Sequence, residues 1–272
     1  MKKILINGIN YTSSYFYDFP EKYDVVSKIN PDADFHDLSL KYECIVNFYE
    51  NKTGDFLEIF DDNFLYVKNL HQSCSSNNIK LIQISTANVY NRSHAWEENV
   101  ENSELLNLHN DYLLSKRVCE KFLEQSGCLI LRIKNSFDSR YHPDNWLVKT
   151  YKKDKISNMI DTFTYIPDLK KVIEYLIEKN SSGLYNVVQQ SSGSDLYFFS
   201  SFLKTNKFSH LSPDESQHEQ ILTFSNDKTL ECCDVNCTKL LQIFPSLHDL
   251  NAAVLLCWEN IKNKVDIITE LC

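Results

Sequence analysis

The sequence predicts an α/β protein in which a parallel sheet is covered by helices on both faces. Three observations support this prediction. Short apolar runs alternate with segments of helical period along the first half of the chain. Nearly every run is apolar throughout, as in strands that are buried on both faces. The runs also end at residues typical of turns, such as Asn7-Gly8 and Asn30-Pro31.

The elements of the first half follow in a regular order. Only about a dozen residues separate the second and third apolar runs, which is near the minimum for a crossover between parallel strands, so any helix there is brief. The segment 110–126 is the most regular helix, because its apolar residues keep helical spacing and Gly127 ends it. In chain order, we expect strands over 4–6, 24–29 and 44–48, a helix over 62–77, a strand over 80–85, the helix over 110–126 and a strand over 128–133.

The sequence pattern changes after about residue 136. We therefore divide the chain into a core over 1–136 and a second lobe over 137–272, with the segment of about 161–190 returning to the core. In this half we expect helices over 145–151, 167–178 and 247–263, and extended segments over 162–166 and 184–188.

Composition and charge exclude several classes of protein. The formal net charge is −9, and no run of Lys or Arg is longer than two residues, which argues against a nucleic-acid partner. No apolar stretch approaches the length of about 18 residues that a membrane span needs, so we expect a cytoplasmic protein without a membrane partner. The nine cysteines form no Cys-x-x-Cys pair and stand near no suitably spaced histidine, so we expect reduced thiols and no metal site.

Two segments contain residues with chemical potential. Ser85 and Thr86 end a buried strand, at the edge where open α/β sheets bind ligands. Tyr112 and Lys116 are four residues apart on one helix and therefore share a face. A lysine ammonium beside a tyrosine lowers the phenol pKa, which lets the tyrosine exchange a proton near neutral pH. A Tyr-x-x-x-Lys pair alone is weak evidence for catalysis, but together with the strand-end hydroxyls it favours a catalytic site.

These segments resemble the extended short-chain dehydrogenases/reductases that act on nucleotide sugars, the NAD-dependent epimerase/dehydratase superfamily. The resemblance is strongest to the dTDP-4-dehydrorhamnose reductases and the related 4-keto-6-deoxy-sugar epimerase/reductases. It covers nearly the whole chain, and it implies a Rossmann-like doubly wound parallel sheet with a small C-terminal α/β substrate-binding lobe. The matching segments are QISTANVY at 83–90, YLLSK at 112–116, LILRIKNSFDSR at 129–140 and the stretch 161–189.

The resemblance also implies an activity and roles for residues. The activity is NAD(P)-dependent 4-keto reduction of a nucleotide-linked keto-deoxy sugar, in a rhamnose-type pathway. Thr86 would be the catalytic hydroxyl, Tyr112 the proton donor, and Lys116 the residue that lowers its pKa and binds the cofactor ribose. NAD or NADP would be the cofactor, a nucleotide sugar the substrate, and a homodimer a possible assembly. Substrate contacts are implied for Asn135, Arg140 and Trp146.

The cofactor-binding turn departs from the pattern of that family. A Gly-x-x-Gly-x-x-Gly turn is expected after the first strand, but the chain has Gly8, Tyr11 and Ser14 at the three positions. A glycine at the second position lets the backbone approach a pyrophosphate, and tyrosine removes that freedom. The acid expected after the second strand is also absent, so Asp34 or Asp37 is the candidate contact to adenosine. The candidate cofactor-binding residues are thus Gly8, Tyr11, Ser14, Asp34, Ser85 and Lys116.

Two interpretations of this mixture stay open. Either the chain is a working reductase with an unusual cofactor turn, or it is a weak or inactive relative that serves as a nucleotide-sugar-binding or regulatory subunit. The presence of all three catalytic residue types favours the enzyme. The position of Tyr11 discriminates between them, because a ring projecting into the pyrophosphate space would favour the binding subunit. A 4-epimerase or dehydratase with tightly held NAD is a third interpretation, which the altered turn makes less favourable.

Overall fold

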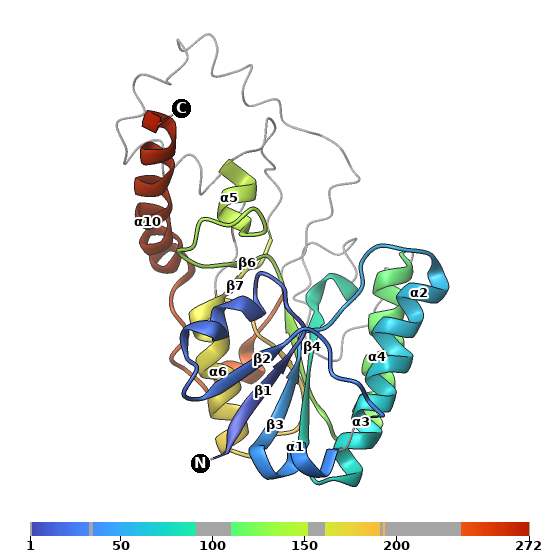
Figure 1. Ribbon diagram of the computed structural model, residues 1–272. Coiled ribbons are helices and arrows are strands. Elements are labelled where there is room, and N and C mark those ends of the chain that lie inside the picture. The colour runs from blue at the N-terminus through green and yellow to red at the C-terminus, as the bar shows by residue number, and fades with distance from the viewer. Residues whose placement is uncertain are drawn as a thin grey trace.

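A computed structural model describes residues 2–32, 35–90, 110–151, 161–190, 193 and 235–271. Its main body is a six-stranded sheet with the strand order β2-β1-β3-β4-β5-β8, in which every neighbouring pair is parallel (Figure 1). This confirms the predicted Rossmann-like doubly wound sheet. The strands are β1 (Lys3–Asn7), β2 (Tyr23–Val26), β3 (Tyr42–Asn47), β4 (Lys80–Thr86), β5 (Leu129–Ile133) and β8 (Gly183–Asn186).

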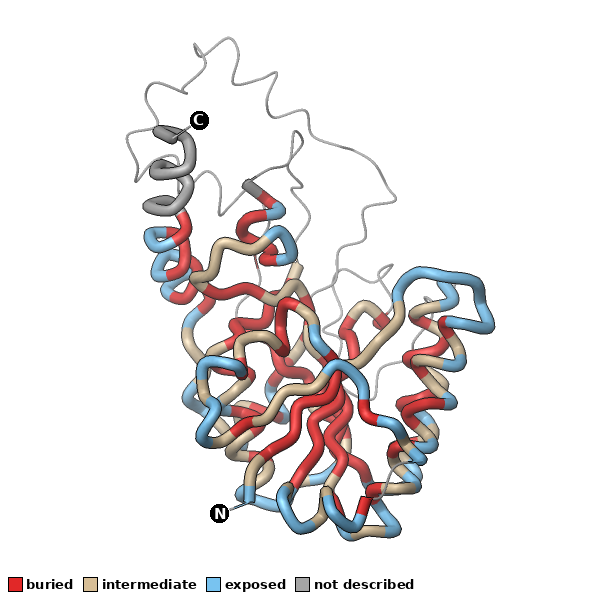
Figure 2. Tube along the Cα trace, viewed as in Figure 1, coloured by how far each residue is buried: buried red, intermediate tan, exposed pale blue. Residues whose placement is uncertain are grey.

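Helices cover both faces of this sheet, because successive strand residues point to opposite sides. Ile4 and Ile6 pack with Phe16 and the apolar stripe of α6 on one face, whereas Leu5 packs with the helices of the other. The strands are accordingly buried along most of their length (Figure 2). The first face carries the 3-10 helix η1 (Ser13–Asp18) and α6 (Ile166–Glu178), and the second carries α1 (Phe35–Lys41), α3 (Tyr66–Ser76) and α4 (Asp111–Gln125).

A helical segment between β3 and α3 was only partly predicted. The helix α2 (Phe56–Phe60) begins at Asp55, whose carboxylate accepts a hydrogen bond from the Glu58 amide at 3.0 Å, while the Glu58 carboxylate accepts one from the Asp55 amide at 3.4 Å. This reciprocal capping box is readable in the sequence, as an aspartate and a glutamate three residues apart before apolar residues. A π-helical turn, η2 (Asp61–Leu65), joins α2 to α3.

The second lobe has its own small core. Two short parallel strands, β6 (Ser136–Phe137) and β7 (Thr164–Tyr165), pack with α5 (Trp146–Tyr151) and α10 (Leu250–Leu271). The last helix begins three residues later than predicted, and the short helix α9 (Thr238–Leu241), next to β8, was not predicted. Between these segments, α6 and β8 return to the main sheet. In the described part of the chain, no helix is long and apolar enough to cross a membrane.

The end of the second strand differs from the prediction. The strand ends at Val26 rather than Ile29. Ile29 is held in the following loop, because its amide donates to the Asn7 side chain at 2.9 Å and its carbonyl accepts from the Tyr66 hydroxyl at 2.9 Å. Lys28 therefore stands close to the strand end, where the sequence analysis looked for an acid.

Candidate active site

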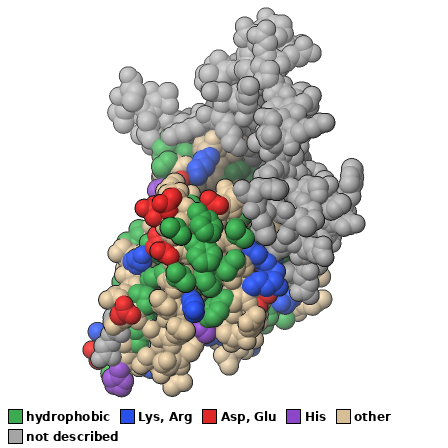
Figure 3. Space-filling model, turned by 90° about the vertical axis from the view of Figure 1, so that its right-hand side faces the viewer, with side chains coloured by type: hydrophobic (Ala, Val, Ile, Leu, Met, Phe, Trp, Pro, Cys, Tyr) green, Lys and Arg blue, Asp and Glu red, His purple; other side chains and the backbone are tan. Residues whose placement is uncertain are grey.

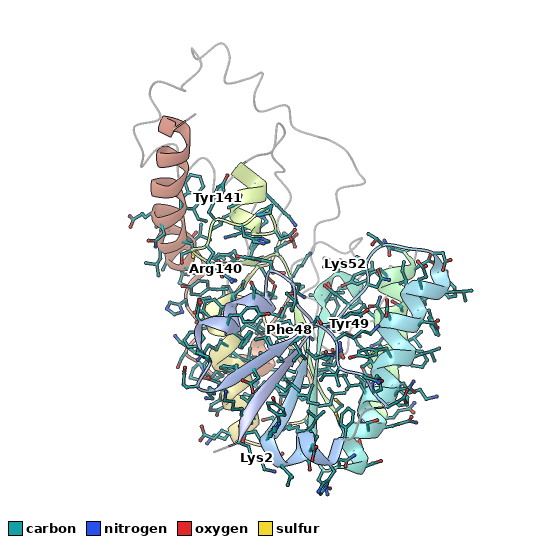
Figure 4. All side chains as sticks on the ribbon, viewed as in Figure 1. Lys2, Phe48, Tyr49, Lys52, Arg140 and Tyr141 are labelled. Atoms are coloured by element: carbon teal, nitrogen blue, oxygen red, sulfur yellow. The ribbon has the colours of Figure 1, made fainter. Side chains whose placement is uncertain are left out.

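A cavity of about 540 Å³ opens at the carboxyl edge of the main sheet, between the core and the second lobe. It lies beside β1 and β3, where the strand order reverses, which is the position where open α/β sheets bind ligands. Figure 4 shows Phe48 and Tyr49 at this edge, with Arg140 and Tyr141 in the lobe. The core contributes the turn after β1, the segment after β3, the end of β4 and the first turn of α4 to the walls.

The structure brings the three predicted catalytic residues together. Thr86 is the last residue of β4, and its hydroxyl accepts a hydrogen bond from the Asn88 amide at 3.2 Å. Tyr112 and Lys116 lie in the first turns of α4, with the lysine Nζ 6.0 Å from the centre of the tyrosine ring. Thr86 and Tyr112 line the cavity, whereas Lys116 lies behind them and is only 4% exposed.

Lys116 is fixed by two acceptors. Its Nζ donates to the Ile84 carbonyl at 3.0 Å and lies 3.6 Å from the Glu50 carboxylate. The Ile84 carbonyl also accepts from the Gln83 side chain at 2.7 Å. Gln83 ends a buried amide ladder across three strands, in which Asn7 donates to Asn47 at 2.6 Å and Asn47 donates to Gln83 at 2.8 Å. The lysine is thus anchored to the sheet itself.

Glu50 is a site residue that the sequence analysis did not identify. The Tyr112 hydroxyl donates to Glu50 Oε2 at 2.6 Å, and Lys52 Nζ lies 2.7 Å from Glu50 Oε1. Burial and the nearby Glu50 carboxylate raise the pKa of Tyr112 well above its ordinary value. The expectation that Lys116 lowers the Tyr112 pKa is therefore wrong for this structure, because Glu50 stands between the two groups and holds the phenolic proton.

The charge on Glu50 is itself stabilised. Burial raises the pKa of this carboxyl group, but Lys116, Lys52 and the bond from Tyr112 outweigh that effect and hold the pKa below its ordinary value. Glu50 is therefore ionised at neutral pH. Its position was visible in the sequence, since it is the third residue after the strand β3 and so lies at the carboxyl edge of the sheet.

The turn after β1 keeps one glycine for a clear reason. Gly8 has a φ of +98°, and a Cβ there would lie 2.3 Å from the Tyr49 amide nitrogen. The rest of the turn is closed by its own side chains: Asn10 Oδ1 accepts from the Ser13 amide at 2.9 Å, and Ser13 Oγ accepts from the Asn10 amide at 2.8 Å. The Ser14 amide also donates to the Asn10 carbonyl at 2.9 Å. These amides are consequently not free for a phosphate.

Tyr11 and Ser14 connect the turn to the second lobe. The Tyr11 hydroxyl donates to Asp138 at 2.8 Å, and its ring stacks on His142 with 5.0 Å between centres. Arg140 donates to Asp138 at 2.6 Å, to Ser14 Oγ at 2.9 Å and to the Tyr11 carbonyl at 3.0 Å. The Tyr11 ring thus forms a wall of the cavity and is held by the lobe.

The remaining predicted residues fall into separate places. Asn135 lines the cavity, and its side chain donates to Asp161 at 2.9 Å and to the Thr162 carbonyl at 3.1 Å. Trp146 and Ser85 also line the cavity. Asp34 lies outside the described residues.

The chain resembles known proteins in its structure and not in its sequence. No family model matches the chain, and no curated protein matches its sequence. The dTDP-glucose 4,6-dehydratase of Bacillus anthracis, solved with NAD, covers 97% of both chains with a TM-score of 0.76 at 15% identity. The UDP-rhamnose synthase of Acanthamoeba polyphaga mimivirus matches 94% of this chain and 100% of its own with a TM-score of 0.75 at 15% identity.

A reductase of this group also matches. The dTDP-4-dehydrorhamnose reductase of Bacillus anthracis, solved with NADP, aligns with 75% of this chain and 81% of its own, with a TM-score of 0.62 at 19% identity. The chain has the fold of these sugar-nucleotide enzymes.

On this sugar-nucleotide-enzyme fold, the predicted site residues separate into two groups. Ser85, Thr86 and Tyr112 share one cavity wall, with Lys116 directly behind it. Ser14 and Arg140 instead bind each other at the turn after β1. The first group is placed to meet a ligand, whereas the second joins the lobe to the core.

Proposed function

We propose that the chain is an NAD(P)-dependent enzyme that reduces a keto group at C4 of a nucleotide-linked deoxy sugar. The observation that supports this most is the arrangement of Thr86 and Tyr112 in one cavity wall with Lys116 behind them. The matching structures with NAD and NADP support the same cofactor class. A cavity of about 540 Å³ is also within the size range of about 300–1,000 Å³ that ligand sites occupy.

The residues at the end of β4 fit the nicotinamide half of a dinucleotide. An ammonium group has three N–H donors, and Lys116 donates one of them to the Ile84 carbonyl at 3.0 Å, while its contact with Glu50 at 3.6 Å is an ion pair, so donors remain for a ribose hydroxyl. Ser85 and Thr12 line the same cavity and offer further hydroxyls. The dinucleotide, when bound, would supply the hydride. At the pyrophosphate half, contacts have to come from side chains, since the amides of Ser13 and Ser14 are engaged.

The protein's own groups would handle the sugar oxygen. Thr86 is placed to hydrogen-bond the keto oxygen, and Tyr112 is placed to give it a proton. Lys52 and Lys149 lie at the cavity wall with side chains 62% and 53% exposed, so they would attract the phosphates of a nucleotide sugar. Trp146 would provide an apolar surface for the sugar or the base.

The alternative of a binding or regulatory subunit has two observations in its favour. Tyr11 lines the cavity at the turn after β1, which is the side of the discriminating criterion that favours this alternative. The turn that usually receives the pyrophosphate is closed by Asn10, and its Ser14 hydroxyl is bound by Arg140. A chain that no longer binds a dinucleotide could keep such a turn without cost. This alternative makes the opposite prediction for cofactor binding.

The deciding experiment is a titration of the purified protein with NADH and NADPH, followed by nicotinamide fluorescence and calorimetry. We expect micromolar binding of one of them, followed by turnover of a dTDP- or UDP-linked 4-keto-6-deoxy sugar. Absence of binding at millimolar concentrations of both would contradict the proposed enzyme and favour the binding subunit. Tight binding of a dinucleotide without turnover of any nucleotide sugar would support the proposed cofactor and contradict the proposed substrate class.

We further propose a homodimer formed through α2 and α4. Hydrophobic side chains gather on this face, with acidic side chains toward its upper edge and basic ones beside and below it (Figure 3). Phe56, Leu57 and Leu65 are 43%, 67% and 40% exposed. A two-fold axis through the apolar centre would bring the acidic edge of one copy near the basic edge of the other, which favours a second copy as the occupant.

Sedimentation velocity tests this assembly. We expect a dimer for the wild-type chain and a monomer for Leu57→Glu, because a charge at the centre of the apolar face opposes its burial. Leu40→Glu is the matched control, since Leu40 is 63% exposed on α1, away from this face. A wild-type monomer at high micromolar concentration would contradict the proposal.

A further inference from the structure

Glu50 occupies the central position of the candidate site. Its Oε2 accepts the phenolic hydrogen of Tyr112 at 2.6 Å and lies 3.6 Å from Lys116 Nζ. The other carboxylate oxygen pairs with Lys52 at 2.7 Å. The side chain is 20% exposed, and it lines the same cavity as Thr86 and Tyr112. The Tyr112 hydroxyl and the Lys116 ammonium group thus both contact the same carboxylate, that of Glu50.

This geometry changes what Tyr112 can do alone. The hydroxyl has a single hydrogen, and that hydrogen points to Glu50. The phenolic oxygen still has lone pairs that can accept a proton from a ligand, and Tyr112 lines the cavity. Burial and Glu50 both disfavour the phenolate, so Tyr112 cannot hold a negative charge as a resting base. When Tyr112 accepts a proton from a ligand, it can pass its own hydroxyl hydrogen to Glu50.

We propose that Glu50 is the proton partner of Tyr112: it accepts the phenolic hydrogen when a sugar hydroxyl is oxidised, and it returns that hydrogen when the ketone is reduced. This inference rests on the proposed function and adds a residue to it. Glu50 acts through Tyr112 and is therefore a positioning and proton-holding residue.

The step balances as follows in the oxidative direction. The hydroxyl proton of the sugar moves to the Tyr112 oxygen, while the original Tyr112 hydrogen moves to Glu50 Oε2. A bound dinucleotide would accept the hydrogen of the carbinol carbon together with its electron pair and would be reduced, as the carbon–oxygen double bond forms. Tyr112 is neutral before and after the step, and Glu50 is the protein group that changes its charge. Reduction runs through the same positions in reverse.

The charged groups around Glu50 support this role. Lys116 and Tyr112 face it from α4, and Glu120 of the same helix acts on Tyr112 from further away. Lys52 faces it from its own segment, and Asp144 and Lys149 line the cavity from the lobe. The two nearby lysines keep the carboxylate ionised at neutral pH, while Tyr112 keeps its proton. The pair is therefore set to accept a proton from neutral pH upwards.

The test compares Glu50→Gln with the matched control Glu43→Gln, which removes an exposed charge at the opposite end of β3. The measurement is the pH profile of sugar-alcohol oxidation between pH 5.5 and 10. We expect a flat wild-type rate from neutral pH upwards. In Glu50→Gln, the rate at neutral pH should fall by about 10²-fold or more and then rise with pH, because Tyr112 itself must ionise. A wild-type profile in Glu50→Gln would overturn the proposal.

A second measurement does not depend on turnover. Carbon-13 NMR of the tyrosine ring carbons, with Tyr112 assigned through Tyr112→Phe, gives the titration midpoint of Tyr112 directly. We expect the midpoint to move to lower pH in Glu50→Gln and to stay in place in Glu43→Gln. An unchanged midpoint in Glu50→Gln would also overturn the proposal, even if the wild-type protein acts on no nucleotide sugar.

The Glu50→Asp variant separates the role from a general disturbance of the fold. A shorter carboxylate keeps the charge but withdraws from the Tyr112 hydroxyl, so we expect a rate between those of the wild type and Glu50→Gln. Equal loss in Asp and Gln variants, with an unchanged NMR midpoint, would mean a packing role alone. Failure of wild-type turnover together with a shifted midpoint would remove the proposed function and leave the Glu50–Tyr112 proton pair intact.

Discussion

Two tyrosines line the same cavity, and each donates its hydroxyl hydrogen to a carboxylate. Tyr112 donates to Glu50, and Tyr11 donates to Asp138. Burial, followed by the neighbouring carboxylate, raises the pKa of both phenols. The two carboxylates differ, because Glu50 lines the cavity whereas Asp138 is 1% exposed and accepts two further bonds from Arg140.

This difference shows how the same pair of groups can serve chemistry or architecture. A carboxylate that lines a cavity and accepts a hydrogen bond from a neighbouring hydroxyl can exchange a proton with a ligand. A carboxylate enclosed by an arginine and a tyrosine has no such access and fixes the relative position of two segments. The second lobe is therefore tied to the turn after β1 by the Tyr11–Asp138 pair, whose carboxylate is buried.

The largest expected effect is that of Tyr112→Phe. Loss of the hydroxyl should lower kcat for the proposed keto reduction by about 10²- to 10⁴-fold, because the proton donor is removed. Dinucleotide affinity should change little, and calorimetry with NADH or NADPH measures it separately. Tyr17→Phe is the matched control, since Tyr17 is 49% exposed. A kcat within threefold of the wild-type value would contradict the role of Tyr112.

The next effect concerns the buried ion pair between Arg132 and Glu120. Arg132 donates to Glu120 at 2.9 and 2.7 Å, and both side chains are fully buried. Arg132→Met should lower the free energy of unfolding by up to about 3–5 kcal/mol, because it removes the buried partner of a buried carboxylate, which then keeps its bond from the partly exposed Arg117 at 3.1 Å. Urea denaturation measures the loss. The double variant Arg132→Met/Glu120→Leu should recover much of it, and equal stability of the single and double variants would contradict the account.

Tyr11→Phe should produce a smaller effect of a different kind. The variant loses the bond to Asp138, which keeps its two bonds from Arg140, so we expect the free energy of unfolding to fall by about 1–3 kcal/mol. The turnover rate of the folded protein should stay close to that of the wild type. A loss of rate as large as that of Tyr112→Phe would show that the two tyrosines do not differ as described.

A third tyrosine–carboxylate pair gives the smallest effect. Tyr23 donates to Glu174 at 2.5 Å, and Lys170 and Lys22 also bind this carboxylate, which is 23% exposed. Burial raises the pKa of Glu174, but the bonds from Tyr23 and the lysines lower it by more. The pair therefore stabilises the fold above the ordinary carboxyl pKa, and this stability is lost as the pH falls through the lowered value.

Glu174→Gln tests whether the contribution of Glu174 to stability is lost as the pH falls. The variant should be less stable than the wild type by no more than about 1 kcal/mol at pH 7, since the group is partly solvated. The difference should shrink between pH 6 and pH 3, as measured by urea denaturation at each pH. A difference that grows in acid would contradict the lowered pKa.

The sequence predicts the main sheet, and also the common helix face of Tyr112 and Lys116, because both depend on local patterns. Apolar runs mark the strands, and the spacing of Tyr112 and Lys116 places them on one helix face. Glu50 escaped prediction because its partner lies 62 residues away, and a polar residue after a strand resembles any solvated loop. The Tyr11–Asp138 bond spans 127 residues, so nothing near the turn indicates it. The early end of β2 likewise depends on tertiary bonds from Asn7 and Tyr66.

The return of the chain to the main sheet has a consequence for dissecting the protein. The sixth strand, β8, pairs along β5, and α6 covers one sheet face. A fragment that stops at residue 136 would lack both elements. Its β5 would become an open sheet edge with unpaired backbone groups, next to an uncovered apolar surface, and such edges promote aggregation. The amino-terminal half should therefore be recovered as insoluble material when it is expressed alone.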